Sequence, residues 1–321
     1  MKPDSDEIRL FIDNLANESW LGSVRSNWVR YIFHHTDIRN AVAILKSGKL
    51  LCRRKLDETG SMVVDNASRP IISSTESLVK DYVRLYFRPR NPTQFRNEGV
   101  RPKDRQWEES HCPVPIFFLF DSKAILTRSD CQFSEGNLAT LGVNGLRSSA
   151  EDLFSFNFKM IYHDSPHNDS SITFHKNAEV VIPNELDLLA LKYIVCRSPA
   201  ERESLLNLLP TEIFVKWSPK ILIDTKANFF SRKWVYVQTA DLTSKYAAID
   251  FSPDVIQASP FLLTAKLKGN REKLIERANF SANKKIVFEF VEDVFIYQIE
   301  VKLDENLVYS GRFDGSDDIP F

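Results

Sequence analysis

The sequence has few cysteines, no long apolar run and almost no net charge, and each absence narrows its class. The four cysteines are widely separated and include no Cys-x-x-Cys pair, so neither a zinc site nor a disulfide framework is predicted. No run of about eighteen apolar residues occurs, and the first seven residues, MKPDSDE, are acidic on balance and contain no apolar stretch. We therefore expect a cytoplasmic protein.

The net charge of −1 argues against a protein that coats duplex nucleic acid nonspecifically. With 321 residues, 43% hydrophobic and 26% charged, the chain has the composition of a soluble globular protein with one large domain or two ordinary ones. The charges are unevenly placed, because segment 84–105 carries seven basic residues against two acidic ones. Its basic residues are Arg84, Arg88, Arg90, Arg96, Arg101, Lys103 and Arg105.

Aromatic residues are interleaved with these cations at Phe87, Phe95 and Trp107. Cations that meet phosphates and rings that stack on bases are the composition of a groove for single-stranded nucleic acid. A solvated loop beside a structural strand has the same composition, and the sequence leaves both interpretations open. We predict that all these cations except Arg90 contact nucleic acid.

Arg90 lies just after a predicted strand at 82–87. The alternation in that segment favours a strand, and Pro89 and Pro92 restrict the backbone on either side of Arg90. A guanidinium held in place beforehand binds two phosphate oxygens at once and loses little entropy in doing so. The segment therefore predicts an anion clamp suited to a diphosphate, with an exposed loop arginine as the simpler interpretation.

Four segments carry motifs: 34–45 (HHTDIRNAVAIL), 81–93 (DYVRLYFRPRNPT), 134–139 (SEGNLA) and 176–182 (KNAEVVI). In this order and spacing they resemble the DarT family, toxins that transfer ADP-ribose from NAD to DNA bases. The resemblance covers roughly residues 30 to 200. Arg84 departs from it, because the family has proline at that position, and Thr93 stands where the family has methionine.

The resemblance implies an α+β protein with the ADP-ribosyltransferase fold, in which split antiparallel β-sheets are flanked by helices. We expect this domain over residues 1–210 and a β-rich α+β extension over residues 211–321. In the domain the sequence predicts one or two helices within 7–30, a helix at 41–46 capped by Asp37 or Asn40, and a loop at 52–74. In the extension it predicts strands within 213–223, 233–239 and 285–303 and a helix near 266–278.

The resemblance assigns catalysis to Glu179, Arg90 and His34. Glu179 is expected to stabilise positive charge on the ribose and to act as general base, Arg90 to hold the diphosphate, and His34 to bond a ribose hydroxyl. A solvent-facing strand glutamate and a histidine buried for packing are the simpler alternatives. The expected NAD-binding residues are His34, Thr36, Asn40, Tyr86, Phe87, Arg90 and Asn137.

The resemblance implies a mono-ADP-ribosyltransferase that modifies a base in DNA and releases nicotinamide. Single-stranded DNA is favoured, because a paired base is reachable only after flipping. Guanine is favoured over thymine. RNA as acceptor, removal of a phosphate from RNA with NAD, and a noncatalytic module that binds nucleic acid or a nucleotide are the alternatives. The resemblance also implies NAD as cosubstrate, no metal, and an antitoxin partner of the macrodomain or NADAR type that hydrolyses the adduct.

Overall fold

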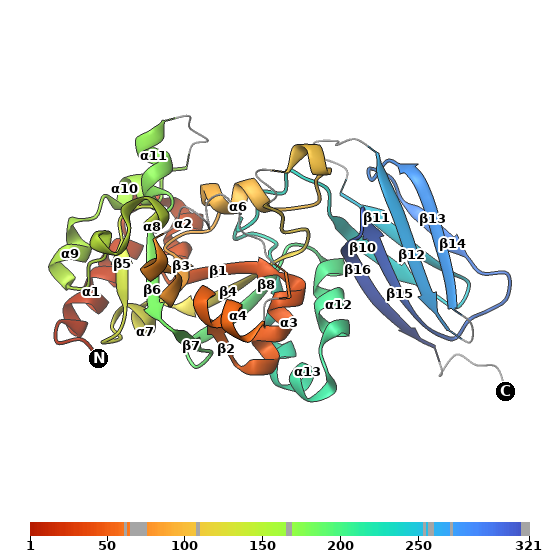
Figure 1. The fold of residues 1–321 in the computed structure, drawn as a ribbon, viewed down its shortest axis with the longest axis horizontal. Helices are drawn as coiled ribbons and strands as arrows, with labels where there is room; N and C mark the ends of the chain where they lie inside the picture. Colours follow the sequence, from red (N-terminus) through yellow and green to blue (C-terminus); the bar gives the residue numbers. More distant parts are fainter. Residues whose placement is uncertain are drawn as a thin grey trace.

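A computed structural model describes residues 1–60, 63–64, 76–106, 110–164, 169–252, 255, 260–269 and 272–315. It consists of a larger α+β unit, on the left in Figure 1, and a β-sandwich on the right, with α12 (Pro199–Leu208) between them. None of the described helices is long and apolar enough to cross a bilayer.

A seven-stranded sheet forms the centre of the larger unit, in the order β5-β6-β3-β1-β4-β8-β9. Its pairs are antiparallel except for β8 with β9. The two-stranded sheet of β2 and β7 is separate, so the expected α+β fold with split sheets is confirmed. The strands are β1 (Tyr31–Asp37), β2 (Lys49–Leu51), β3 (Tyr82–Tyr86), β4 (Pro115–Asp121), β5 (Gln132–Ser134), β6 (Glu179–Pro183), β7 (Glu185–Asp187), β8 (Leu191–Cys196) and β9 (Ile221–Ile223).

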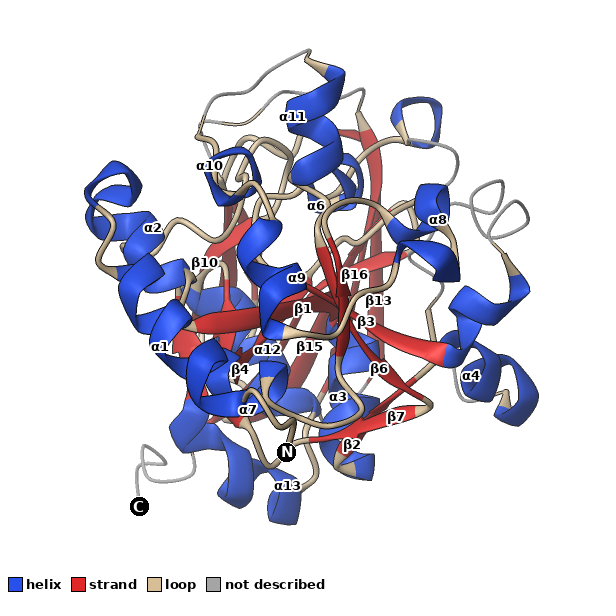
Figure 2. Cartoon of the chain, turned by 90° about the vertical axis from the view of Figure 1, so that its left-hand side faces the viewer, coloured by secondary structure: helices blue, strands red, loops and turns tan. Residues whose placement is uncertain are grey.

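Helices surround this sheet, as Figure 2 shows. Short 3₁₀ helices at Ser19–Leu21, Ser77–Asp81, Lys103–Arg105, Val143–Gly145 and Ser218–Lys220 join several elements. The α-helices are α1 (Ser5–Ala16), α2 (Gly22–Trp28), α3 (Ile38–Ser47), α4 (Arg53–Thr59), α6 (Pro92–Asn97), α7 (Ser122–Leu126), α8 (Leu138–Leu141), α9 (Ala150–Ser155), α10 (Phe158–Ile161), α11 (Ser170–His175), α12 and α13 (Thr211–Trp217).

Local signals fix both ends of α3. The Asp37 carboxylate accepts the Arg39 amide at 3.0 Å and so satisfies one of the N–H groups that a helix start leaves unpaired. Gly48 ends the helix with φ 75°, a left-handed conformation that glycine adopts without strain. Asp37, rather than Asn40, is therefore the cap.

The C-terminal unit is a sandwich of two antiparallel sheets, β10-β11-β14 and β13-β12-β15-β16. Both sheets contribute to one apolar core, which includes the fully buried Ile249, Leu263 and Val301. The strands are β10 (Val237–Leu242), β11 (Tyr246–Phe251), β12 (Phe261–Lys268), β13 (Glu272–Phe280), β14 (Ile286–Glu289), β15 (Ile296–Leu303) and β16 (Asn306–Asp314).

The helix expected near 266–278 is wrong, because that segment belongs to the hairpin of β12 and β13. Leu263, Ala265 and Leu267 are buried at every second position, which is the period of a strand.

The strand expected within 213–223 is wrong over most of its length, because α13 occupies Thr211–Trp217. This helix starts after Pro210 and places Trp217 in the core, and only Ile221–Ile223 forms a strand. The loop expected at 52–74 likewise contains a helix, α4, at Arg53–Thr59; residues 61–62 and 65–75 lie outside the described part of the chain.

Two hydrophobic cores divide the described chain near residues 231–234. Phe229 and Phe230 are the last members of the first core along the chain. The second core begins in sequence order with Val100 and Ala200 from the larger unit and continues from Val235 into the sandwich. We therefore propose a boundary near 231–234 rather than at 210, with shared apolar contacts joining the two units.

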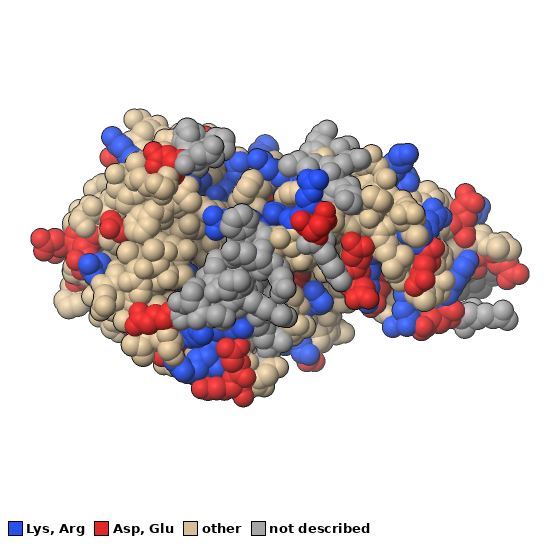
Figure 3. Space-filling view, turned by 45° about the horizontal axis from the view of Figure 1, so that its top comes forward, with Lys and Arg blue, Asp and Glu red and all other residues tan. Residues whose placement is uncertain are grey.

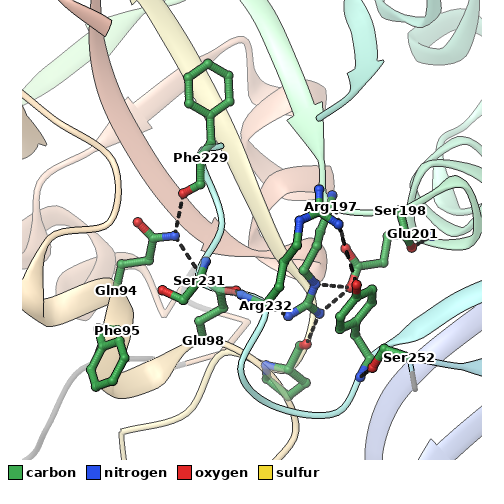
Figure 4. A network of polar contacts seen from close by, with 12 residues as sticks. Gln94, Phe95, Glu98, Arg197, Ser198, Glu201, Phe229, Ser231, Arg232 and Ser252 are labelled. Atoms are coloured by element: carbon green, nitrogen blue, oxygen red, sulfur yellow. Dashed lines mark hydrogen bonds and ion pairs between the residues drawn. The ribbon is translucent and has the colours of Figure 1, made fainter. Parts of the chain in front are cut away.

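A buried ion pair strengthens the junction at the start of α12. Arg197 is fully buried and is paired with Glu201 one helical turn later, and its Nη1 lies 3.6 Å from Glu98 Oε1. Its guanidinium also lies 4.3 Å from the centre of the Tyr236 ring, where the chain enters the sandwich. Figure 4 shows Arg197 among its polar partners.

Replacing Arg197 by methionine is expected to lower the free energy of unfolding by about 3–5 kcal/mol, because buried carboxylates lose their counter-charge. Denaturant titration measures this change. The matched control, Lys192→Met, removes an exposed pair with Asp121 at 3.3 Å. We expect this control to change the free energy by less than about 1 kcal/mol. Equal effects of the two substitutions would contradict the role given to Arg197.

Candidate active site

Three neighbouring strands bring the predicted catalytic residues together. Tyr86 of β3 is opposite Glu179 of β6, and Phe33 of β1 is opposite Tyr86 from the other side of β3. Residues far apart in the sequence thus become neighbours at the centre of the sheet (Figure 2). His34 and Arg84 lie on the same strands as these residues.

The Glu179 carboxylate is buried and accepts three hydrogen bonds. Oε1 accepts the Leu138 amide at 3.0 Å and Arg84 Nη2 at 2.6 Å, while Oε2 accepts Arg84 Nε at 2.5 Å. Burial opposes the charge on Arg84, but the carboxylate outweighs it and raises the pKa of Arg84. Glu179 is therefore an interior carboxylate held by a bidentate guanidinium, and not the solvent-facing strand residue of the simpler interpretation.

Asn137 links this ion pair to α8. Its Oδ1 caps the helix by accepting the Ala139 amide at 2.9 Å, and it also accepts Arg84 Nη2 at 3.3 Å. A Cβ on the preceding Gly136 would lie 2.3 Å from the Phe174 ring, so glycine is required for the close approach. Asn137 thus lies beside Glu179, and its contact with NAD stays a prediction.

His34 is held as a neutral ring. Its Nδ1 lies 3.2 Å from the Arg84 carbonyl oxygen, which can only accept, so Nδ1 carries the hydrogen. Burial lowers the pKa of His34 to about 4, which keeps the ring neutral at pH 7. Nε2 is then an acceptor, as a bond from a ribose hydroxyl requires.

Thr36 and Asn40 are joined to each other and to the chain at Val64. Asn40 Nδ2 donates to Thr36 Oγ1 at 3.2 Å and to the Val64 carbonyl at 2.8 Å, and Asn40 Oδ1 accepts the Val64 amide at 3.0 Å. The amide of Asn40 therefore positions the segment that follows α4. Direct contact of either residue with NAD stays a prediction.

Arg90 lies in a turn with a left-handed backbone, φ 54°, which costs a non-glycine residue roughly 1–2 kcal/mol. Asn91 caps α6 by accepting the Gln94 amide at 2.8 Å, and Pro92 is the first helical residue. The guanidinium of Arg90 makes no hydrogen bond or ion pair with the residues that the structure describes. The turn thus presents a half-buried cation that is not used within the described fold.

A buried polar network holds this turn in place (Figure 4). Gln94 Oε1 accepts the Arg90 amide at 2.5 Å, and Gln94 Nε2 donates to Glu98 at 2.8 Å and to the Phe229 carbonyl at 2.9 Å. Glu98 also accepts the amides of Ser231 and Arg232 at 2.9 and 2.8 Å. The prolines are therefore only part of what sets the direction of Arg90.

Lys176 was not predicted to have a role in the site. Burial, together with the positive charges of Arg88 and Arg90, lowers its pKa to about 8, and the charge of Asp164 partly offsets this. Arg90 and Lys176 therefore lie close enough to interact. The sequence signal was its position three residues before Glu179, inside segment 176–182.

The two aromatic residues expected beside nicotinamide differ in their surroundings. Phe87 is buried in the core against Phe156 and Phe158, so the expectation that it lines the NAD site is corrected. Tyr86 is 9% exposed, and burial followed by the Glu179 charge raises its pKa to about 12. Of the two, only Tyr86 faces the ion pair, because successive strand residues point to opposite sides.

Arg88 and Arg101 are structural, which corrects their expected role in binding nucleic acid. Arg88 is 3% exposed and donates to the carbonyls of Ile161 and His163 at 2.8 and 2.7 Å. Arg101 is 6% exposed, donates to the Phe95 carbonyl at 2.6 Å and stacks over Trp234 at 4.5 Å. Neither guanidinium is exposed enough to contact a nucleic-acid strand.

The remaining cations form a smaller set than expected. Arg96 is half-buried on α6, Arg105 is exposed, and Lys103 lies in the 3₁₀ helix with Arg105; Trp107 lies outside the described residues. Phe95 is 44% exposed, and the ammonium of Lys233 lies 4.8 Å from its ring centre. Lys233, on the chain that enters the sandwich, was missed because it is distant in sequence. Figure 3 shows lysine and arginine gathered across the middle of one face.

The comparison with protein families decides the assignment. The family described as "ssDNA thymidine ADP-ribosyltransferase, DarT" matches residues 33–231. The chain belongs to the DarT family. It is therefore an NAD-dependent ADP-ribosyltransferase, and the match contains every predicted site residue. The family description names thymidine, so the expected preference for guanine has no support.

Solved structures of DarT proteins align with this chain at low identity. Thermus sp. 2.9 DarT in complex with ADP-ribosylated ssDNA is 16% identical with a TM-score of 0.49, over 63% of this chain and 96% of that one. The same protein in complex with NAD+ is 18% identical with a TM-score of 0.47, over 63% and 97%. Thermosipho africanus DarTG in complex with ADP-ribose is 17% identical with a TM-score of 0.47, over 63% and 51%. No curated protein matches the chain.

The described residues contain no group of three or more His, Cys, Asp or Glu side chains placed to hold a metal ion. The four cysteines are buried free thiols.

Replacing Gln94 by methionine is expected to raise the KM for NAD about tenfold and to lower the free energy of unfolding by about 1–3 kcal/mol. The substitution leaves the Arg90 amide without its acceptor and removes one of the donors to Glu98, so the turn loses its position. Initial-rate kinetics and denaturant titration measure the two effects. Gln298→Met on the exposed face of β15 is the control. An unchanged KM in a correctly folded Gln94→Met variant would disprove this role.

The KM for NAD is expected to rise between pH 7 and pH 9, because Lys176, with a pKa of about 8, loses its charge beside Arg90 as the pH increases. In Lys176→Met we expect a KM raised about fivefold at pH 7 and no further rise across this window. Lys159→Met, at an exposed position of α10, should keep the behaviour of the unaltered protein. A pH dependence that survives in Lys176→Met would assign it to another group.

Proposed function

We propose that this chain transfers ADP-ribose from NAD to thymidine in single-stranded DNA and releases nicotinamide. The observation that carries the proposal is that β6, β3 and β1 are adjacent, so that Glu179 and His34 lie on neighbouring strands and the Arg90 turn follows the strand between them, inside the segment that matches the DarT family. Thermus sp. 2.9 DarT has been solved in complex with ADP-ribosylated ssDNA, which is the same kind of product.

In the proposed reaction the bond between C1′ of the ribose and the nicotinamide nitrogen breaks, and its electron pair leaves with nicotinamide. A nitrogen of the base forms the new bond to C1′ and gives up its proton. The carboxylate of Glu179 stabilises the positive charge on the ribose and accepts that proton. Nε2 of His34 orients a ribose hydroxyl, and Arg90 with Lys176 holds the diphosphate.

Single-stranded DNA suits the exposed cations better than a duplex does. The accessible set, Arg105 with Phe95 and Lys233, is small and includes an aromatic ring. Such a set supports stacking and a few phosphate contacts rather than the many contacts of nonspecific duplex binding. RNA is the alternative acceptor, because none of the described cations and rings distinguishes a 2′-hydroxyl.

We also infer that the chain acts as the toxin of a pair, since modified bases obstruct replication unless the adduct is removed. The partner would be a hydrolase of the macrodomain or NADAR type. Expression in bacteria should arrest growth with the unaltered chain and not with Glu179→Ala, and co-expression with the partner should relieve the arrest.

The test is mass spectrometry of four DNA oligonucleotides, each lacking a different base, after incubation with NAD and the protein. We expect the added mass of ADP-ribose on the three that contain thymidine and none on the fourth. Glu179→Ala should lower product formation by about 100-fold or more while retention of the oligonucleotide persists. An adduct on the thymidine-free strand would reassign the base, and an adduct on RNA alone would reassign the acceptor. No adduct on any strand would favour a noncatalytic binder.

A further inference from the structure

Arg84 lies on the open side of Glu179. In the pair the side chain of Arg84 is 30% exposed and that of Glu179 is 1% exposed, so the guanidinium is the partner nearer to solvent. It contacts both carboxylate oxygens, Nε with Oε2 at 2.5 Å and Nη2 with Oε1 at 2.6 Å. A substrate group that reaches Glu179 must therefore approach past Arg84.

The bonds of Glu179 leave one oxygen for a substrate. A carboxylate oxygen accepts about two hydrogen bonds. Oε1 already accepts from Arg84 Nη2 and from the Leu138 amide, whereas Arg84 Nε is the single donor to Oε2 among the residues that the structure describes. With the pair intact, Oε2 is the atom that remains to meet a hydroxyl or to receive a proton.

Arg84 is itself held in place by more than its partner. Its Nη2 donates to Asn137 Oδ1 at 3.3 Å, and its main-chain carbonyl accepts from His34 Nδ1 at 3.2 Å. One residue thus fixes the carboxylate through its side chain and the tautomer of the histidine through its backbone. A residue that positions a catalytic group must itself be held in place, as Arg84 is by these two contacts. A side chain that only meets a phosphate needs no such support.

We propose that Arg84 is a positioning residue that fixes the orientation and charge of the Glu179 carboxylate so that Oε2 faces the ribose. The inference rests on the proposed function and replaces the expectation that Arg84 binds nucleic acid. It also gives a reason why a buried carboxylate on the apolar strand β6 is tolerated, since an unpaired charge there would be strongly unfavourable.

The surroundings of Glu179 make Arg84 the main control on its charge. The titratable groups of β3 that face it are Arg84 and Tyr86, and the phenol is neutral at pH 7 because its pKa is raised to about 12. The neighbouring positions of β5 and α8 are Ser134 and Leu138, which do not titrate. Without the guanidinium, the buried carboxylate would lose this counter-charge and keep the Leu138 amide as its donor.

The test compares Arg84→Met, Arg84→Gln and Arg84→Lys with the unaltered protein on the thymidine oligonucleotide. In Arg84→Met we expect kcat at pH 7 to fall about 100-fold, the acidic limb of the kcat–pH profile to move up by about one pH unit or more, and the KM for the oligonucleotide to change less than about threefold. Arg84→Lys should recover part of kcat and most of the pH profile, because it restores the charge but not the fork.

The contrasting variant is Arg105→Met, at an exposed predicted strand contact, for which we expect a higher oligonucleotide KM and a weaker salt dependence with little change in kcat. If Arg84→Met behaves like Arg105→Met, or keeps kcat and its pH profile, the positioning role is refuted. Arg84→Gln preserves polarity and volume and serves the same purpose if the methionine variant does not fold. The unaltered protein must form the adduct first, so failure of the proposed function is recognised separately.

Discussion

The arrangement of the site depends on the hydrogen bonds that the buried carboxylate of Glu98 accepts. Glu98 accepts the amide of Gln94 and the main-chain amides of Ser231 and Arg232, and Arg197 supplies positive charge 3.6 Å away. Through Gln94 this carboxylate sets the backbone of Arg90, and through Arg197 it reaches the sandwich. The Arg90 turn and the junction of the two units therefore share one set of hydrogen bonds, so a change at one of them is expected to affect the other.

Two interior carboxylates are stabilised by arginine in different ways. Glu98 has donors on both oxygens from main chain and side chain, and so it serves structure. Among the described residues, Glu179 has a single donor to one of its oxygens, and its arginine lies towards solvent. Pairing with arginine thus gives a carboxylate with donors on both oxygens in one place and, in the other, a carboxylate with room for a further hydrogen bond.

Short-range signals in the sequence were enough for part of this structure. The cap at Asp37, the end of α3 at Gly48 and the apolar strand that begins at Glu179 each depend on adjacent residues. The predictions that were wrong concerned features set by residues distant in the sequence, or by which face of a strand points inward. Phe87 and Arg88 were misassigned because their burial is set by α9, α10 and their loops, and the hairpin of β12 and β13 was read as a helix because its pairing partners could not be known from the segment alone. The bonds from Gln94 to Phe229 and from Arg84 to Glu179 span 135 and 95 residues, so spacing in the sequence gives no sign of them.

The position of residues 229–232 late in the larger unit affects the order in which the site is completed during synthesis on the ribosome. Synthesis runs from the N-terminus, and domains fold as their segments emerge. His34, Arg84 and Glu179 are all made before the segment that supplies the Phe229 carbonyl and the amides of Ser231 and Arg232. The turn that carries Arg90 thus acquires its final support only when residues 229–232 have been made. A nascent or prematurely terminated chain therefore contains Glu179 and His34 but lacks the bonds that fix the Arg90 turn.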